Sequence, residues 1–188
     1  QKMEVSIKTR WAYELSHTYG AFPQDDPNVF SSYIFKSPNG KLSCYERLLH
    51  TYKKSNEVYA KHYRTNYSQL RTPPAWVTAS LFTMGEVVNW IKYLKRPKDR
   101  KNILNVYGLD EKIMVSFLSH LVWVRNICAH NNRLWNRNIN MPFSLPSNKR
   151  IKLIEYLITS QSNQPKIYNT IIMLHFILKK IDVEYQFL

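Results

Sequence analysis

Apolar residues recur at helical spacing in several stretches of the chain. In residues 3–20 they are mostly three or four positions apart: Val5, Ile7, Trp11, Ala12 and Leu15. That stretch ends at Gly20, a residue typical of helix C-termini. The pattern therefore predicts a first helix that buries one face.

Further helices are predicted downstream, with loops wherever proline and glycine cluster. Pro73 and Pro74 stand at a helix start, and Asp110 is a suitable N-cap for the helix that contains Val115. The predicted helices are 45–63, 75–94, the stretch after Asp110, about 149–159, and about 165–181. The basic stretch 95–102, with sequence KRPKDRKN, is interpreted as a loop.

Together these helices predict an all-α fold of about six helices in a single domain, residues 1–188. The strand-like runs VSI and YIF are too isolated to form a sheet, and only four glycines are present. No apolar run is long enough to span a membrane. Two cysteines without metal-ligand spacing, Cys44 and Cys128, fit free thiols in a reducing cytoplasm, so we expect a cytoplasmic protein.

The charge balance points to a polyanionic partner. Lysine and arginine number 27 against 13 acidic residues, a net charge of +14 spread along the chain. Nucleic acid is the commonest partner of such a protein. A cationic surface that serves only solubility and an anionic membrane surface are the alternatives.

The stretch VRNICAHNNRLWNR, residues 124–137, holds three arginines, one histidine and four asparagines directly after an apolar segment. A helical projection predicts a core face and an opposite polar face. The core face comprises Phe117, Leu121, Val124 and Cys128, and the polar face comprises Ser119, Asn126, His130 and Arg133. Arg125 lies on the flank, so it could converge with His130 on one small anion, with Asn126 beside them.

An arginine separated from a histidine by four to six intervening residues is by itself an unspecific pattern. Arg10 and His17 also satisfy it. Neither metal-ligand spacing nor a glycine-rich phosphate loop occurs, so we expect no metal and no cofactor. Glu86, the one acid in a predicted buried helix, is more typical of a satisfied core acid than of a catalyst, although it could orient Arg125 or His130.

Three longer stretches carry a family resemblance. RNICAHNNRLWNR resembles the signature of the Abi-like family of abortive-infection proteins, of the AbiD/AbiF type. EVSIKTRWAYELSHTYGAF is similar to the early helix of that family, and PPAWVTASLFTMGEVVNW to its Pro-Pro-x-Trp helix. They occur in family order and span most of the chain.

The family is similar to HEPN-type proteins, and this resemblance implies a HEPN-like helical bundle with additional helices. It also implies a metal-independent RNA-cleaving site in which the matched residues are Arg125, Asn126 and His130. Two copies of the motif would meet in a homodimer, and a cognate antitoxin, a protein or a structured RNA, would restrain the toxin. Relatives often have a longer N-terminal region, so an upstream segment is expected to be missing.

Cleavage without a metal would use the ribose 2′-OH as the nucleophile and leave 2′,3′-cyclic phosphate ends. A histidine can transfer protons near neutral pH, and an arginine fork can hold phosphate oxygens. Predicted RNA contacts are Arg133, Arg137, Lys95, Arg96, Lys98, Arg100 and Lys101. Trp135 could stack on a base, but we favour Leu134 and Trp135 as anchors of the helix end in the core.

The first hypothesis is therefore an endoribonuclease that acts as an abortive-infection toxin, with RNA as its substrate. A catalytically inert RNA-binding module is the second hypothesis. A helical protein-interaction domain of a phage-defence system is the third, and weak RNA binding at moderate salt would favour it.

Overall fold

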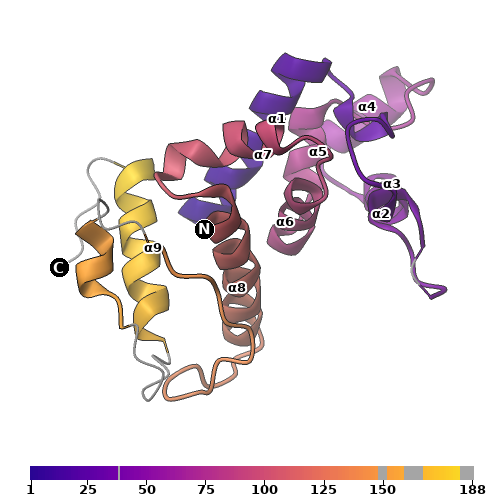
Figure 1. Ribbon diagram of the computed structural model, residues 1–188. Helices are drawn as coiled ribbons and strands as arrows, with labels where there is room; N and C mark the ends of the chain where they lie inside the picture. The colour runs from indigo at the N-terminus through magenta and orange to yellow at the C-terminus, as the bar shows by residue number, and fades with distance from the viewer. Residues whose placement is uncertain (38, 148–151, 159–166, 183–188) are drawn as a thin grey trace. The chain divides into compact units, whose positions relative to one another are not determined.

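The computed structural model describes residues 1–37, 39–147, 152–158 and 167–182 (Figure 1). Within these residues the protein has nine α-helices and no strand, which confirms the all-α prediction. None of the described helices is long and apolar enough to cross a membrane. The chain divides into two compact units, Gln1–Ile103 and Leu104–Leu188. Each unit is described separately, and a single domain stays a prediction.

The described residues of the first unit form seven helices, of which the fifth and sixth pack against the first. Its helices are α1 (Lys2–Tyr19), α2 (Ser32–Phe35), α3 (Cys44–Lys54), α4 (Val58–Asn66), α5 (Ala75–Leu81), α6 (Met84–Lys92) and α7 (Pro97–Leu104). A short 3-10 helix, Pro23–Asp25, follows α1. As predicted, α1 ends at Gly20, which has a positive φ of 82° and donates its N–H to the Ser16 carbonyl.

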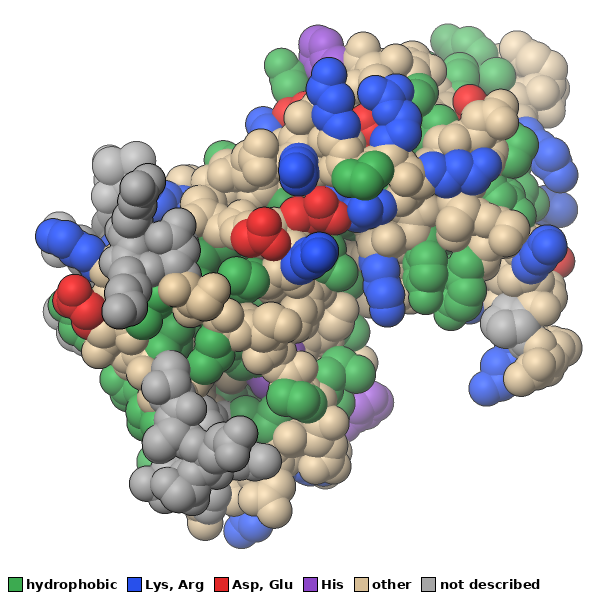
Figure 2. Space-filling view, viewed as in Figure 1, with side chains coloured by type: hydrophobic (Ala, Val, Ile, Leu, Met, Phe, Trp, Pro, Cys, Tyr) green, Lys and Arg blue, Asp and Glu red, His purple; other side chains and the backbone are tan. Residues whose placement is uncertain are grey.

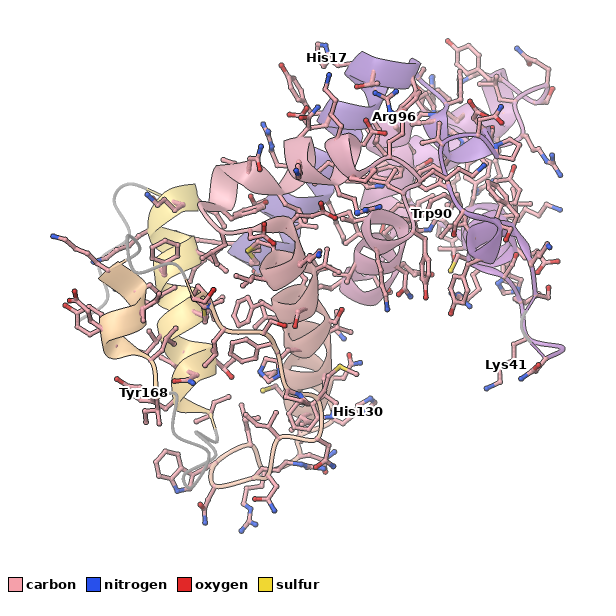
Figure 3. The ribbon with its side chains drawn as sticks, in the orientation of Figure 1. His17, Lys41, Trp90, Arg96, His130 and Tyr168 are labelled. Atoms are coloured by element: carbon pink, nitrogen blue, oxygen red, sulfur yellow. The ribbon has the colours of Figure 1, made fainter. Side chains whose placement is uncertain are left out.

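Four buried aromatic side chains form the centre of this unit. Trp90 contacts Phe30 edge-on at 4.8 Å between ring centroids and stacks on Phe82 at 5.5 Å. Trp11 meets Phe82 edge-on at 5.1 Å. Figure 3 labels Trp90 on α6. Because aromatic pairs of this geometry add to the burial of large apolar surfaces, the cluster fixes α1, α5 and α6 against one another.

The prediction of a single helix over residues 75–94 is wrong, because the structure has two helices there, α5 and α6. Phe82 leaves the helical conformation to enter the aromatic cluster. Thr83 then begins α6 with a capping box: its hydroxyl accepts the Glu86 N–H, and Glu86 accepts the Thr83 N–H at 2.7 Å. The Glu86 carboxylate therefore caps a helix rather than satisfying a core position.

The prediction of one helix over residues 45–63 is also wrong, because this segment forms two helices, α3 and α4. Ser55 and Glu57 between them have extended backbones. The Arg64 guanidinium on α4 donates to the Ser55 carbonyl at 2.6 Å and to the Tyr52 carbonyl. Arg64 thus satisfies carbonyls that the end of α3 leaves without helical partners.

The basic stretch predicted as a loop is largely helix α7. Pro97 occupies its first turn, where a missing N–H costs nothing. Asp99 is buried and accepts a hydrogen bond from the Tyr19 hydroxyl at 2.5 Å, while Ile103 and Leu104 are fully buried. This anchorage of both ends converts the charged sequence into a packed helix.

The second unit is built on two long helices. They are α8 (Glu111–Ala129) and α9 (Tyr168–Ile181), and the residues described between them include a non-helical segment, 130–147, and a 3-10 helix, Lys152–Tyr156. Another 3-10 helix, Asn105–Tyr107, precedes α8 and packs against α9. Asn169 on α9 holds the end of Lys152–Tyr156 by exchanging two hydrogen bonds with the Ile158 backbone, at 3.0 and 2.8 Å.

Of the two helices predicted for the C-terminal part, the described residues show only the last as an α-helix. Within 149–159, the described residues form only the 3-10 helix Lys152–Tyr156; residues 149–151 and 159 lie outside the described residues. The last helix is confirmed from Tyr168 to Ile181, while residues 165 and 166 also lie outside the described part.

We expect Thr83→Ala to lower the free energy of unfolding by about 1 kcal/mol, because it removes the side-chain cap of α6. Thr18→Ala is the matched control, since the Thr18 hydroxyl is exposed and bonds only within its own helix, to the Glu14 carbonyl. Urea titration followed by circular dichroism measures both. Equal stability of the two variants would show that the capping box does not hold the break between α5 and α6.

Candidate functional site

Helix α8 positions the motif predicted from the sequence. It begins at Asp110, whose carboxylate accepts the Lys112 N–H at 2.9 Å, so the predicted N-cap is confirmed. Phe117 and Leu121 are buried as predicted, but Val124 is only half-buried and Cys128 is exposed. Ile127 is buried instead. The predicted core face was therefore wrong at its C-terminal end.

The end of α8 is a Schellman motif. The Asn132 N–H donates to the Ile127 carbonyl at 3.0 Å, and the Asn131 N–H to the Cys128 carbonyl at 3.0 Å. Asn131 takes the left-handed conformation, with φ of 53°, that glycine usually supplies at this position. The helix therefore stops at Ala129, and His130 is its C-cap.

Three of the predicted site residues are exposed at this helix end: Arg125, Asn126 and His130. Figure 3 shows His130 at the end of α8. At about 100° per residue, Arg125 and His130 stand about 140° apart around the helix, with Asn126 between them. The Arg125 guanidinium leans toward Asn126, with Nη1 at 3.4 Å from Oδ1. The structure thus places the three side chains in a row without direct contact between Arg125 and His130.

Arg133 is not on the helical face predicted for it, because α8 ends before it. The chain turns back beyond it, with the Arg137 N–H bonded to the Leu134 carbonyl and Asn136 at positive φ. Trp135 stands in this turn with 78% of its surface exposed. Our preference for Trp135 as a core anchor was therefore wrong, since the turn directs its ring into solvent.

Arg137 returns to the surface of α8. Its guanidinium lies over the ring of Trp123, with Cζ 5.9 Å from the centroid, a cation–π distance. Trp123 precedes His130 by seven residues, so the two share a face of the helix, with Asn126 about 60° away. The turn thereby brings a second arginine to the face that carries Asn126 and His130.

A buried histidine fixes the segment that follows this turn. His120 is fully buried on α8, with Nδ1 at 2.7 Å from the Met141 carbonyl oxygen and Nε2 at 2.8 Å from the Thr170 hydroxyl on α9. Because a carbonyl only accepts, Nδ1 carries the proton, and Nε2 accepts from the hydroxyl when the ring is neutral. His120 therefore joins α8, α9 and the returning segment.

The returning segment runs back along α8 (Figure 1). The Phe143 ring meets Phe117 at 5.0 Å and His120 at 4.7 Å between centroids. The Ser144 N–H donates to the Ser116 hydroxyl at 2.8 Å. These contacts explain why burial on α8 shifts toward the His120 face. Burial lowers the pKa of the His120 imidazole, and the hydrogen bond to the Met141 carbonyl opposes that shift.

The predicted RNA-contacting residues of 95–102 divide into two groups. Lys98 and Lys101 are exposed on α7. The others bind protein groups: Lys95 donates to the Pro27 carbonyl, Arg96 lies 3.7 Å from Asp99, and Arg100 donates to the Leu94 carbonyl. Their role in binding RNA stays a prediction. Figure 2 shows lysine and arginine side chains scattered over the visible face of the first unit.

Arg10 and His17, the second pair with the loose spacing, have a different environment. Arg10 pairs with Glu14 at 2.6 Å and donates to the Asn102 carbonyl at 3.2 Å. Its guanidinium is thus committed within the first unit, whereas Arg125 has no acidic partner among the described residues. In the same residues, no three His, Cys, Asp or Glu side chains are grouped so that they could hold a metal ion.

Sequence reasoning missed three residues that shape this site: His120, Trp123 and Asn131. For Asn131 a signal existed, because asparagine is the usual substitute for glycine at a helix C-terminus. His120 and Trp123 gave none, since their partners lie 50 and 14 positions further along the chain. Their roles depend on the return of the chain after Trp135.

An all-α protein with an exposed arginine–histidine motif at a helix end is the class that these observations define. The sequence profile of the Abi-like protein family matches residues 1–136. The chain therefore belongs to the Abi-like family, and that membership indicates a role in abortive infection, a form of phage defence. No curated protein and no solved structure matches the chain significantly.

The match contains the first two stretches on which the resemblance rests and all but the last residue of the third. It includes Arg125, Asn126, His130 and Arg133, and ends directly before Arg137. Helix α9, which holds His120 through Thr170, lies beyond it.

We expect Asn131→Val to destabilise the protein by about 1–3 kcal/mol, because a β-branched residue is strained at positive φ. Asn131→Gly should be tolerated, since glycine adopts this conformation without strain. Asn132→Val is the control, because Asn132 is equally exposed and has no positive φ. Thermal unfolding distinguishes them, and equal losses for both valine variants would argue against the Schellman end.

We also expect stability to decline as the pH falls below about 6.5, the ordinary pKa of histidine. Since burial lowers the His120 pKa in the folded state, the unfolded chain binds the proton first and acid favours unfolding. His120 contributes at most about 1.4 kcal/mol per pH unit.

Urea titrations between pH 7.5 and 5 measure this slope. His120→Asn, which cannot titrate, should flatten it, while His62→Asn, at an exposed position on α4, should leave it unchanged. A slope that His120→Asn does not alter would contradict the assignment.

Proposed function

We propose that this Abi-like protein is a metal-independent endoribonuclease of the HEPN type, acting as an abortive-infection toxin. One observation supports it most. Arg125, Asn126 and His130 are exposed together at the polar end of a helix that buries one face. Within the described part of the chain, no acid pairs with Arg125 and no protein group bonds the His130 ring. Both groups are therefore available to a substrate.

Each side chain has a task in the reaction. The Arg125 fork would hold two oxygens of the scissile phosphate and stabilise the charge that builds on them. The His130 imidazole would move a proton, from the attacking 2′-OH or to the departing 5′-oxygen. Asn126, between them, would bind a phosphate oxygen or the ribose through its amide. The products are a 2′,3′-cyclic phosphate and a 5′-OH.

One histidine does not serve both proton transfers at once. A homodimer that brings two α8 ends together would supply a second His130, one as base and the other as acid. It would also place two Arg125 side chains around the phosphate. This arrangement suits the row of separate side chains, because the groups that must converge would come from two copies.

Arg133, Arg137 and Trp135 extend the same surface. Arg137 is held over Trp123, and Arg133 is exposed at the start of the turn. These cations would position the RNA through its phosphates, without reading its sequence. The exposed Trp135 ring offers a face on which a base can stack. Because such a toxin would harm its own cell, the cell would need a cognate antitoxin that restrains it.

The test is cleavage of end-labelled RNA in EDTA by the wild-type protein, His130→Ala and Arg125→Ala. We expect wild type to cut and leave cyclic-phosphate ends, and each variant to lose about 100-fold or more in rate. His62→Ala and Lys53→Ala are the controls, since they remove an exposed histidine and an exposed cation elsewhere.

Two outcomes would contradict the proposal. If no RNA is cut while wild type and both variants bind RNA alike, the protein is an inert binding module. If cutting requires a divalent ion, the chemistry differs from the one proposed.

A further inference from the structure

The first unit has a groove that the proposed cleavage does not use. It has a volume of about 650 Å³ and is formed by side chains of α1 and α5. Its exposed apolar side chains are large: Val5 at 56%, Tyr13 at 54% and Trp76 at 52% of their surface. A contiguous patch of this kind usually marks a binding surface.

The groove has aromatic residues on both of its helices and small ones between them. Tyr13 and His17 on α1 lie 4.3 Å apart between ring centroids, and Trp76 belongs to α5. The remaining lining includes the small side chains Thr9, Ala12, Ser16, Ala79 and Ser80. Small residues let a flat ring approach the helix backbones, so the groove suits a planar aromatic group.

A buried hydrogen-bond network holds Trp76 in this exposed place. The Pro73 carbonyl, three residues before it, accepts hydrogen bonds from Gln24 at 2.8 Å and from the Thr78 hydroxyl at 2.9 Å. The Ala75 N–H donates to the Ala21 carbonyl at 2.8 Å. The start of α5 is thus rigid, although the tryptophan that it presents stays half in solvent.

One of the residues that line the groove, Ser16, has a hydroxyl without a partner in the described part of the chain. The Ser16 hydroxyl is buried and forms no hydrogen bond within the described residues. Buried hydroxyls nearly always bond something, so this one suits a ligand with donors or acceptors on its edge. A purely apolar helix from a protein partner would leave it unsatisfied.

A second hollow, of about 450 Å³, adjoins the groove at Ser80. Lys54 and His50 line it, together with Glu57. The first unit has 17 lysines and arginines against 8 acids. These positive charges would attract the phosphates that flank a base bound in the groove. The groove therefore suits a nucleic acid better than an uncharged aromatic compound.

We infer that the α1–α5 groove binds an unpaired base of single-stranded nucleic acid, stacked by Trp76, Tyr13 and His17, with Ser16 bonding its edge. Lys54 contacts the flanking phosphate. The binding does not require that the protein cleave RNA. Double-stranded RNA keeps its bases in the stack, so the groove does not take it.

The experiment measures binding of a short single-stranded oligoribonucleotide that carries one 2-aminopurine, by its fluorescence. His130→Ala protein is used so that the probe stays intact. Trp76→Ala should weaken binding at least about fivefold, since stacking on an aromatic ring contributes about 1–3 kcal/mol per base. Trp76→Phe should retain part of the affinity.

Thr9→Glu gives a second, independent variant, since it places a carboxylate in the groove without removing an aromatic ring. It should weaken binding several-fold, whereas Thr18→Glu, exposed on the same helix outside the groove lining, should change it much less. Circular dichroism checks that each variant is folded.

Unchanged affinity in both Trp76→Ala and Thr9→Glu would overturn the inference. So would self-association that Trp76→Ala abolishes while RNA binding persists, because the groove would then be a protein interface. Cleavage by the wild-type protein is assayed separately, so failure here leaves the proposed ribonuclease site untouched, and the reverse also holds.

Discussion

The candidate site depends on the buried imidazole of His120. Its two nitrogens tie the Met141 carbonyl and the Thr170 hydroxyl to α8, at 2.7 and 2.8 Å. A buried polar group is costly unless each hydrogen bond is made, so this node strongly favours one path for the chain between α8 and α9. That path is what carries Arg137 back onto Trp123 and leaves Trp135 in solvent.

The helix end then determines which groups face the substrate. If α8 continued past Ala129, Arg133 would lie on the predicted polar face of the helix, together with Asn126 and His130. Because Asn131 adopts a left-handed conformation and closes the Schellman motif, α8 ends at Ala129. His130 is then the C-cap of the helix and is exposed to solvent. The polar residues after it form a tight turn, and Arg137 is brought to the helix surface by packing on Trp123 rather than by helical periodicity.

Much of the fold was predictable from the sequence, because long amphipathic helices have a strong periodic signal. The C-terminus of α1 at Gly20 and the N-cap Asp110 followed from local residue preferences. The break between α5 and α6 was present in the sequence as Thr83 and Glu86, the spacing of a capping box, but the apolar run around it suggested one helix. Helix α7 was missed because its stability comes from the buried contact of Asp99 with Tyr19, 80 residues away.

The candidate site, like the fold, was only partly predictable from the sequence. Arg125, Asn126 and His130 were identified by their pattern, and their exposure followed from the polarity of the segment. The burial of Ile127 in place of Cys128 was not predictable, since Ile127 lies seven residues after His120, on the face against which the returning segment packs. Trp135 was judged by its hydrophobicity alone, whereas the turn that contains it decides its exposure.

The most direct test of the central claim replaces a single ribose in an RNA substrate. A 2′-deoxy nucleotide is placed on the 5′ side of one cleaved bond, and cleavage is compared at that bond and at its unmodified neighbours. If the 2′-OH is the nucleophile, cutting at the modified bond disappears while the neighbouring bonds are cut as before. Cutting at the modified bond at an unchanged rate would contradict the account, because Arg125 and His130 would then serve a different chemistry.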